Sequence, residues 1–133
     1  MQTKQFLLTS ALALGLGCSL AQAAADWPSQ TLKLVVGFPA GSSPDLTARA
    51  LAEPLGKALG QTFIVENRAG AGGNIGGAEA VRSAPDGYNL AVTNMGAISI
   101  NPAIYAKLSF DPLKDFAPVA NIGAQDIVLM VLD

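Results

Sequence analysis

The chain has 133 residues, of which 50% are hydrophobic and 14% are charged, with 14 glycines and 8 prolines. This composition is typical of a globular protein with many tight turns, and it excludes an intrinsically disordered chain. The formal net charge of −2 excludes a broad basic surface, and with it a nucleic-acid-binding function.

Residues 1–23 have the pattern of a secretory signal peptide. A lysine near the start is followed by an apolar and small-residue stretch, Phe6–Leu20, and Ala21-Gln22-Ala23 fits the small-x-small cleavage pattern. A membrane anchor would need about 20 strongly apolar residues, whereas this stretch is shorter and rich in Ala, Ser and Gly. We expect cleavage after Ala23, a periplasmic location and no membrane insertion of the mature chain.

Cys18 is the single cysteine, and the sequence contains no histidine. Acylation of Cys18 would make a lipoprotein, but Gly15 stands where such sites favour a large aliphatic residue. Removal of the leader would leave no Ser-His or Cys-His pair and no Cys or His metal ligand. We therefore expect a binding protein without metal or cofactor rather than an enzyme.

The first half of the remaining chain predicts one βαβ unit. Leu32–Phe38 is a short apolar run typical of a strand buried on both faces, and Thr62–Asn67 is a second strand. Between them, leucines at helical spacing, Leu51, Leu55 and Leu59, predict a helix that ends at Gly60. An interior proline, Pro54, predicts a bend or break near Glu53.

The next segment repeats this plan. A glycine-rich turn over 70–77 precedes a helix predicted over Asn74–Ser83, and a Pro-Asp-Gly turn leads to a strand over Leu90–Thr93. A small-residue turn, Asn94–Ala97, and a short helix around Pro102–Lys107 follow. Alternating strands and helices predict a doubly wound α/β fold, in which ligands bind beyond the carboxyl ends of the strands.

From residue 108 the pattern is loop-like. We predict two further strands, Val119–Ile122 and Ile127–Leu132. The second runs to the chain end without a covering helix, so we expect either a fragment or a partner that covers it.

The turn Phe38–Leu46, with sequence FPAGSSPDL, is the best candidate for a ligand site. Ser43 is predicted to cap the following helix, with Pro44 and Asp45 in its first turn. The amides of residues 40–43 could then converge on an anion. The alternative is an ordinary capped βα turn.

The chemistry of this turn favours a carboxylate over a phosphate, because the turn contains no Lys or Arg. A nucleotide is disfavoured at the second glycine turn, since Ile75 occupies a position where the dinucleotide motif needs glycine. We interpret those glycines as close helix-to-sheet packing, with Asn74 as a cap. Arg68 is expected to pair with Glu66, and several other residues are expected to have structural roles: Trp27, Tyr88 and Tyr105 in packing, and Asp111 and Asp115 in capping turns.

Several motifs in this order resemble the extracytoplasmic solute-binding proteins of the tripartite tricarboxylate transporter family, also called Bug proteins. They are the runs FPAGSSPDL, VENRAGAGGNIG, APDGY, INPAIY and DFAPVA, and the resemblance spans nearly all of residues 27–132. It implies a periplasmic-binding-protein-like, Venus-flytrap fold that captures a small carboxylate and delivers it to membrane permease subunits.

The resemblance also implies that backbone amides and water in the loop after the first strand hold the ligand carboxylate, with Asp45 facing the cleft and a second contact in the loop after the third strand. The residues implied are Phe38, Pro39, Ala40, Gly41, Ser42, Ser43, Asp45, Asn94, Gly96 and Ala97. This chain departs from the family at Ser42, where a second glycine is usual, and at Ile98, where many members have a polar residue.

Members of this family run to roughly 300 residues, the size of two domains. The resemblance therefore implies that the chain is an N-terminal part, with domain 1 over residues 24–115 and the start of domain 2 over 116–133. A lone first domain would bind more weakly than a closed pair of domains. Two alternatives remain open at this point: a non-functional fragment, and a small secreted α/β enzyme using Asp45 with Arg68 or Tyr88.

Overall fold

A computed structural model describes residues 26–124 of the chain. In chain order its elements are β1 (Leu32–Val36), α1 (Ser43–Leu59), β2 (Phe63–Asn67), a 3-10 turn η1 (Ala71–Gly73), α2 (Asn74–Arg82), β3 (Asn89–Val92), a π-helical turn η2 (Gly96–Ile100) and α3 (Asn101–Ile104). The expected signal peptide, Cys18 and the strand predicted over Ile127–Leu132 lie outside the described residues.

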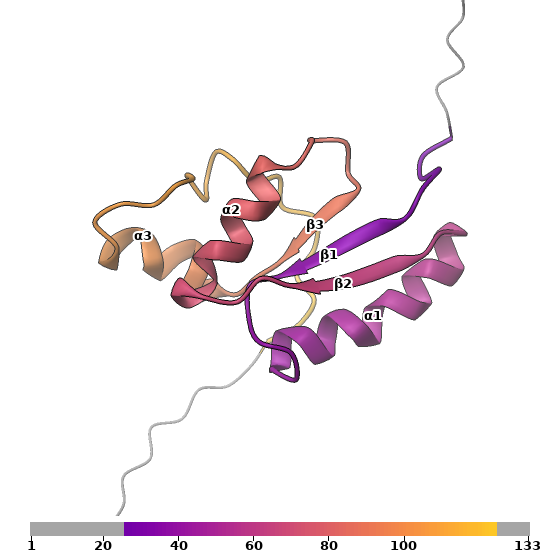
Figure 1. The fold of residues 1–133 in the computed structure, drawn as a ribbon, viewed down its shortest axis with the longest axis horizontal. Helices are drawn as coiled ribbons and strands as arrows, with labels where there is room; N and C mark the ends of the chain where they lie inside the picture. Colours follow the sequence, from indigo (N-terminus) through magenta and orange to yellow (C-terminus); the bar gives the residue numbers. More distant parts are fainter. Residues whose placement is uncertain (1–25, 125–133) are drawn as a thin grey trace, which may run out of the picture.

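The three strands form one parallel sheet in the order β2-β1-β3. In register, Leu34 of β1 lies opposite Val65 of β2 and Leu90 of β3. Figure 1 shows α1 on one face of the sheet and α2 on the other, and α1 contacts β1 and β2 while α2 contacts β1 and β3. The predicted doubly wound α/β fold is thereby confirmed. The division into domains at residue 115 stays a prediction.

The hydrophobic core lies between α1 and the sheet. Its buried members are Leu34, Val36, Ala48 and Val92, with Phe38, Ala52, Phe63, Val65 and Leu90 packed against them. Full burial of each Leu or Val contributes about 1.5–3 kcal/mol. The predicted leucine stripe of α1 is only partly right, because Leu51 and Leu55 are half-buried while Leu59 is 37% exposed. Ala48, on the same helix, is fully buried in the core against the sheet.

A bend or a break is predicted near Glu53, and the helix α1 is continuous from Ser43 to Leu59, so it does not break there. Pro54 lies on the exposed side of the helix, where water can satisfy the carbonyl that its missing amide leaves without a donor. The predicted end is confirmed, because Gly60 has φ 67° and its amide donates to the carbonyl of Gly56.

The predicted N-cap of α1 is wrong in its position, by one residue, and in the side-chain hydrogen bond that the capping serine is expected to accept. Ser42, with an extended backbone, precedes the helix and makes no side-chain cap bond, while Ser43 is already helical. The Ser42 hydroxyl instead donates to the carbonyl of Pro39 at 2.6 Å. The Ser42 hydroxyl is thus used within the turn before the helix, and no helical amide donates to it.

The glycine turn after β2 packs closely on the end of β1, as predicted. A Cβ on Gly76 would lie 2.6 Å from the Cα of Gly37, so only glycine fits there. Gly73, with φ 96°, directly precedes α2, and therefore Asn74 is the first helical residue rather than the cap. Its side chain is buried and bonds elsewhere, as described below.

After β3 the helix begins earlier than predicted. Helical backbone starts at Met95 and continues through η2 and α3 to Ile104, so only Thr93 and Asn94 form the connection. The strand predicted over Val119–Ile122 is wrong, because these residues form no strand in the described part of the chain and Val119 is 81% exposed. An apolar β-branched run becomes a strand only where a neighbouring strand pairs with it.

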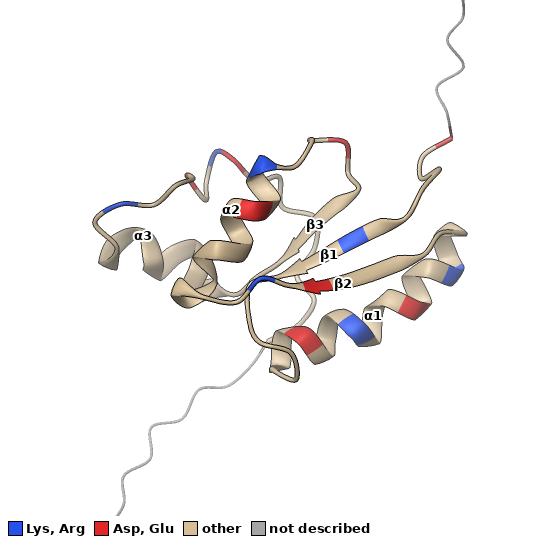
Figure 2. Cartoon of the chain, viewed as in Figure 1, with Lys and Arg blue, Asp and Glu red and all other residues tan. Residues whose placement is uncertain are grey.

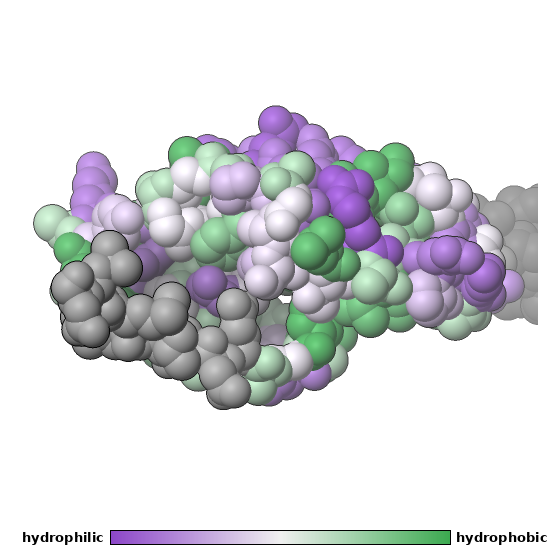
Figure 3. All heavy atoms as spheres, turned by 90° about the horizontal axis from the view of Figure 1, so that it is seen from below, coloured by the Kyte–Doolittle hydropathy of each residue, from purple (hydrophilic) through white to green (hydrophobic). Residues whose placement is uncertain are grey.

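The surface seen from the α1 side mixes polar and apolar side chains (Figure 3). Exposed apolar residues are spread over several elements: Leu46, Ile64, Ile75, Met95 and Ile104 are all at least 49% exposed. Within residues 26–124 no helix has the length and apolar character to cross a bilayer.

Candidate functional site

The carboxyl ends of β1 and β3 define the candidate site. The order β2-β1-β3 places the switch in winding direction between β1 and β3, which is where doubly wound sheets bind ligands. Phe38 from the loop after β1 and Ala97 from the helix after β3 approach each other at Gly73, because a Cβ there would lie 3.2 Å from the Phe38 ring and 3.3 Å from the Ala97 Cβ. Segments that follow all three strands therefore meet at this edge.

The loop after β1 is a tight turn over residues 39–42. The Ser42 amide donates to the Pro39 carbonyl at 3.2 Å, and Gly41 has φ 82°, as the third residue of a type II turn requires. Pro39, Ala40 and Gly41 are exposed, while Phe38 is half-buried against the core. The turn thus presents backbone to solvent above an anchored aromatic side chain.

The predicted anion site of four converging amides needs correction. The Gly41 amide donates to Asp45 Oδ2 at 2.7 Å, and the Ser42 amide is taken by Pro39. The amides of Ala40 and Ser43 have no acceptor among residues 26–124. Two of the four amides therefore lack an acceptor among the described residues, and a protein carboxylate already occupies part of the position predicted for an anion.

Asp45 differs most from its predicted role. It is 1% exposed, and its carboxylate accepts from the Gly41 amide, from Arg49 Nε at 3.1 Å and from Asn67 Nδ2 at 2.9 Å. Arg49 Nη2 also lies 3.0 Å from Asp45 Oδ1. A carboxylate with about four acceptor positions is filled by these donors. Asp45 does not face a cleft in this structure. Its buried carboxylate instead binds the backbone of the loop, through the Gly41 amide.

Sequence reasoning missed the two partners of Asp45. Asn67 Nδ2 also donates to the Phe38 carbonyl at 3.1 Å, and Asn67 Oδ1 accepts from Arg49 Nη2 at 3.1 Å. The spacing of Asp45 and Arg49, one helical turn apart, is the signal that could have identified the ion pair. We call Asp45, Arg49 and Asn67 the loop clamp.

The loop clamp shifts the acidity of its carboxylate. Hydrogen bonds from Arg49, then from the Gly41 amide and Asn67, lower the pKa of Asp45 from 3.8 to about 2. A carboxyl group whose pKa is lower in the folded chain stabilises the fold above its unfolded pKa. That contribution falls as the pH drops through the window from about 4 to about 2.

A pH-dependent stability difference follows for Asp45→Asn. We expect wild type to be more stable than this variant at pH 5 and the difference to shrink between pH 4 and pH 2, as measured by urea unfolding. Ser42→Ala is the matched control, since it removes only the hydroxyl bond to Pro39 and nothing that titrates. A difference for Asp45→Asn that stays constant over this window would contradict the assignment.

The segment after β3 is held in place by one of its own side chains, that of Asn94. Asn94 Oδ1 accepts from the Ala97 amide at 3.1 Å, and this contact starts the helix there. Asn94 is exposed, Gly96 is half-buried and Ala97 is 4% exposed. Of the three residues predicted here, Asn94 is the one whose side chain is open to a ligand.

A buried amide pair joins this helix to the glycine turn, and sequence reasoning did not find it. Asn101 Nδ2 donates to Asn74 Oδ1 at 2.7 Å and to the Gly72 carbonyl at 3.1 Å. Asn101 and Asn74 are 5% and 9% exposed. The pair ties the segment after β3 to the one after β2, across 27 residues.

Charges lie outside the candidate loops. Figure 2 shows the loop after β1 without a charged residue, while acidic and basic residues alternate along α1. Arg68 pairs with Glu66 as predicted, and Lys33 lies 3.5 Å from Glu66 as well. Tyr88 packs on Trp27 at the start of β3, as predicted. It lies at the opposite end of the sheet from Asp45, which contradicts the alternative of an enzyme site that combines these two residues.

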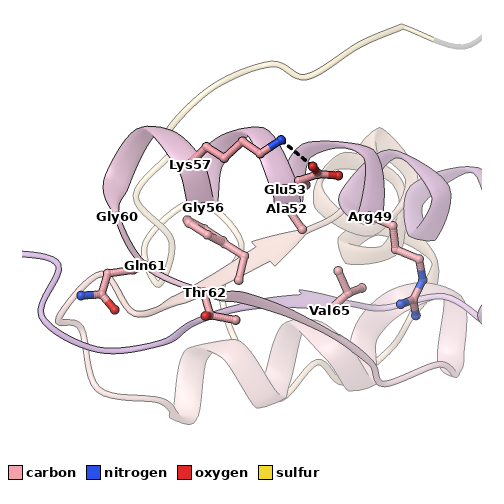
Figure 4. A pocket seen from close by; sticks show the side chains of 10 residues that line it. Arg49, Ala52, Glu53, Gly56, Lys57, Gly60, Gln61, Thr62 and Val65 are labelled. Atoms are coloured by element: carbon pink, nitrogen blue, oxygen red, sulfur yellow. Dashed lines mark hydrogen bonds and ion pairs between the residues drawn. The ribbon is translucent and has the colours of Figure 1, made fainter.

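An open groove of about 690 Å³ lies elsewhere, between the second half of α1 and the edge strand β2. Figure 4 shows Arg49 at one end and Gln61 at the other, with the Lys57–Glu53 ion pair on its rim. None of its lining residues belongs to the predicted site, and Arg49 is the one that it shares with the loop clamp. Within residues 26–124, no group of three His, Cys, Asp or Glu side chains is placed to hold a metal ion.

Residues 47–133 match the family model described as the tripartite tricarboxylate transporter family receptor. The chain belongs to this family. A protein of Cupriavidus necator is 37% identical to it over 98% of this chain, and the chain spans 41% of that relative's length. The family is one of transporter receptors, in agreement with the expectation of a binding protein rather than an enzyme.

Solved structures of similar proteins share the fold. A periplasmic transporter structure is 43% identical with a TM-score of 0.69, over 71% of this chain and 32% of the other. MatC of Rhodopseudomonas palustris, solved with bound malate, is 38% identical with a TM-score of 0.67, over 70% and 32% of the two chains. A further R. palustris protein, solved with adipate, is 34% identical with a TM-score of 0.64, over 66% and 29%.

Proposed function

We propose that this receptor binds a small organic carboxylate in the periplasm, at the edge where β1 and β3 end, and passes it to the membrane subunits of a tripartite tricarboxylate transporter. The observation that carries the proposal is the cation-free turn after β1, in which Ala40 and Ser43 are exposed and their amides have no acceptor among residues 26–124. Two amides match one singly charged carboxylate group better than a doubly charged phosphate.

The segment after β3 supplies the opposite side of this binding site. Asn94 is exposed there and offers an amide group, while Met95, 72% exposed, offers an apolar surface beside it. A ligand with a carboxylate at one end and an aliphatic body fits these two chemistries. Malate and adipate, bound by the two related proteins, are both dicarboxylates, and the methylene chain of adipate also provides an aliphatic body.

The export part of the proposal rests on the leader-like residues 1–23 and on the family. Transfer to membrane subunits rests on the family alone. Both go beyond the described residues. Mass spectrometry of the protein recovered from the periplasm would check the expected new N-terminus after Ala23.

Ligand binding is tested by calorimetry on the full-length protein. We expect at least one of malate and adipate, or another small mono- or dicarboxylate of a panel, to bind, and the diamide of the same acid not to bind. The diamide keeps the carbon skeleton and removes the charge, so it is the matched control. Failure of the whole panel, or equal binding of acid and diamide, would contradict the proposal.

A further inference from the structure

We propose that the loop clamp, Asp45, Arg49 and Asn67, fixes the turn after β1 in its ligand-receiving shape before any ligand arrives, so that these three are positioning residues rather than ligand contacts. The inference rests on the proposed function for the identity of the ligand. It assigns a role to two side chains, Arg49 and Asn67, that the sequence pattern did not single out.

The loop clamp makes hydrogen bonds to the turn at both of its ends. Asn67 Nδ2 donates to the carbonyl of Phe38, where the turn begins, and Asp45 Oδ2 accepts from the amide of Gly41, near its end. A 2.9 Å hydrogen bond between Asn67 Nδ2 and Asp45 Oδ1 links these two contacts. The span between Phe38 and Gly41 is therefore held by side chains of α1 and β2, in addition to the turn's own hydrogen bonds to the Pro39 carbonyl.

Every polar atom of Asn67 is used. Both Nδ2 hydrogens have acceptors, Phe38 O and Asp45 Oδ1, and Oδ1 accepts from Arg49 Nη2. Asn67→Asp keeps the shape but replaces two donors with acceptors that would face a carbonyl and a carboxylate. This isosteric change should release the turn, because like partners at these distances repel.

Arg49 neutralises Asp45. Without this cation, a carboxylate just beneath the turn would oppose the approach of an anionic ligand. Arg49 Nη2 and Nε lie 3.0 and 3.1 Å from the two Asp45 oxygens, and half of the Arg49 side chain is exposed. The loop clamp thus shapes the turn without leaving net negative charge beside the amides of Ala40 and Ser43.

The test measures the protection of the turn and the affinity for the ligand in separate experiments, both on the full-length protein. Hydrogen exchange followed by NMR reports the Gly41 amide without any ligand. We expect exchange about tenfold slower or more in wild type than in Asp45→Asn or Asn67→Asp, with β1 amides unchanged. Calorimetry with malate and adipate then reports affinity, which we expect to fall about tenfold or more in both variants.

Two controls separate positioning from general damage. Glu53→Gln makes the same kind of charge change one helical turn beyond Arg49, in an exposed ion pair with Lys57, and should leave both readouts unchanged. Leu32→Ala creates a cavity at the far end of β1, where Leu32 is 0% exposed, and should lower stability without changing Gly41 exchange relative to its neighbours.

Equal Gly41 exchange in wild type and Asp45→Asn, or wild-type affinity in Asn67→Asp, would overturn the inference. If Gly41 is protected as expected but wild type binds no carboxylate, the proposed ligand class fails while the loop clamp is supported.

Discussion

Gly76→Ala is expected to lower the free energy of unfolding by about 2 kcal/mol or more. The added Cβ would lie 2.6 Å from the Cα and 3.0 Å from the amide nitrogen of Gly37, and backbone atoms at the end of a central strand cannot move aside locally. Because α2 would be pushed away from β1, ligand affinity should fall as well. Urea unfolding followed by circular dichroism measures the change.

Gly77→Ala, the next residue of the same helix, is the matched comparison for this prediction. Its Cβ would meet the ring of Phe110 at 2.7 Å, but a ring can rotate outward, and alanine gains up to about 1 kcal/mol of helix propensity over glycine. We expect Gly77→Ala to stay within about 1 kcal/mol of wild type. Similar losses in the two variants would show that the Gly37 contact is not special.

Asn101→Ala is expected to be the second severe change, with a loss of about 2–3 kcal/mol. It removes the donor to Asn74 Oδ1 and to the Gly72 carbonyl, and leaves a buried amide oxygen without its partner. Thermal or urea unfolding measures the loss.

Removal of an asparagine side chain at an exposed position, Asn121, provides the control. Asn121 is exposed, and its side chain accepts only from the nearby Gly123 amide in the described part of the chain, so Asn121→Ala should be close to neutral. A cycle with Asn74→Ala should show coupling of about 1 kcal/mol between residues 74 and 101. Additive effects in that cycle would contradict a direct contribution of the amide pair.

The sequence predicted the fold where local pattern and tertiary contacts agree. The apolar run of β1, the helix end at Gly60 and the close packing of the glycine turn were all predicted correctly. Each follows from a short-range rule: burial on two faces, a left-handed cap, or a missing side chain.

Local rules failed where a distant group decides the outcome. The Gly41 amide is predicted to be available, yet it donates to Asp45. The buried position of Asp45 depends on a bond from Asn67, which lies 22 residues away and which no local pattern reveals. Pro54 predicts a bend or a break, although its exposed position allows the helix to continue. Val119–Ile122 was read as a strand, although the described residues offer it no pairing partner.

The bond between Asn67 and the Phe38 carbonyl also has a consequence for the order in which contacts form as the chain folds. The turn after β1 is complete in sequence by Ser43, yet the donor that holds its first carbonyl is the last residue of β2. During synthesis, the Phe38 carbonyl therefore lacks this donor until the whole first βαβ unit has emerged and β2 has docked beside β1. The local bonds of the turn, from Ser42 to Pro39 and from Gly41 to Asp45, need no such pairing, so the turn has one set of contacts that can form early and one that forms only with the sheet.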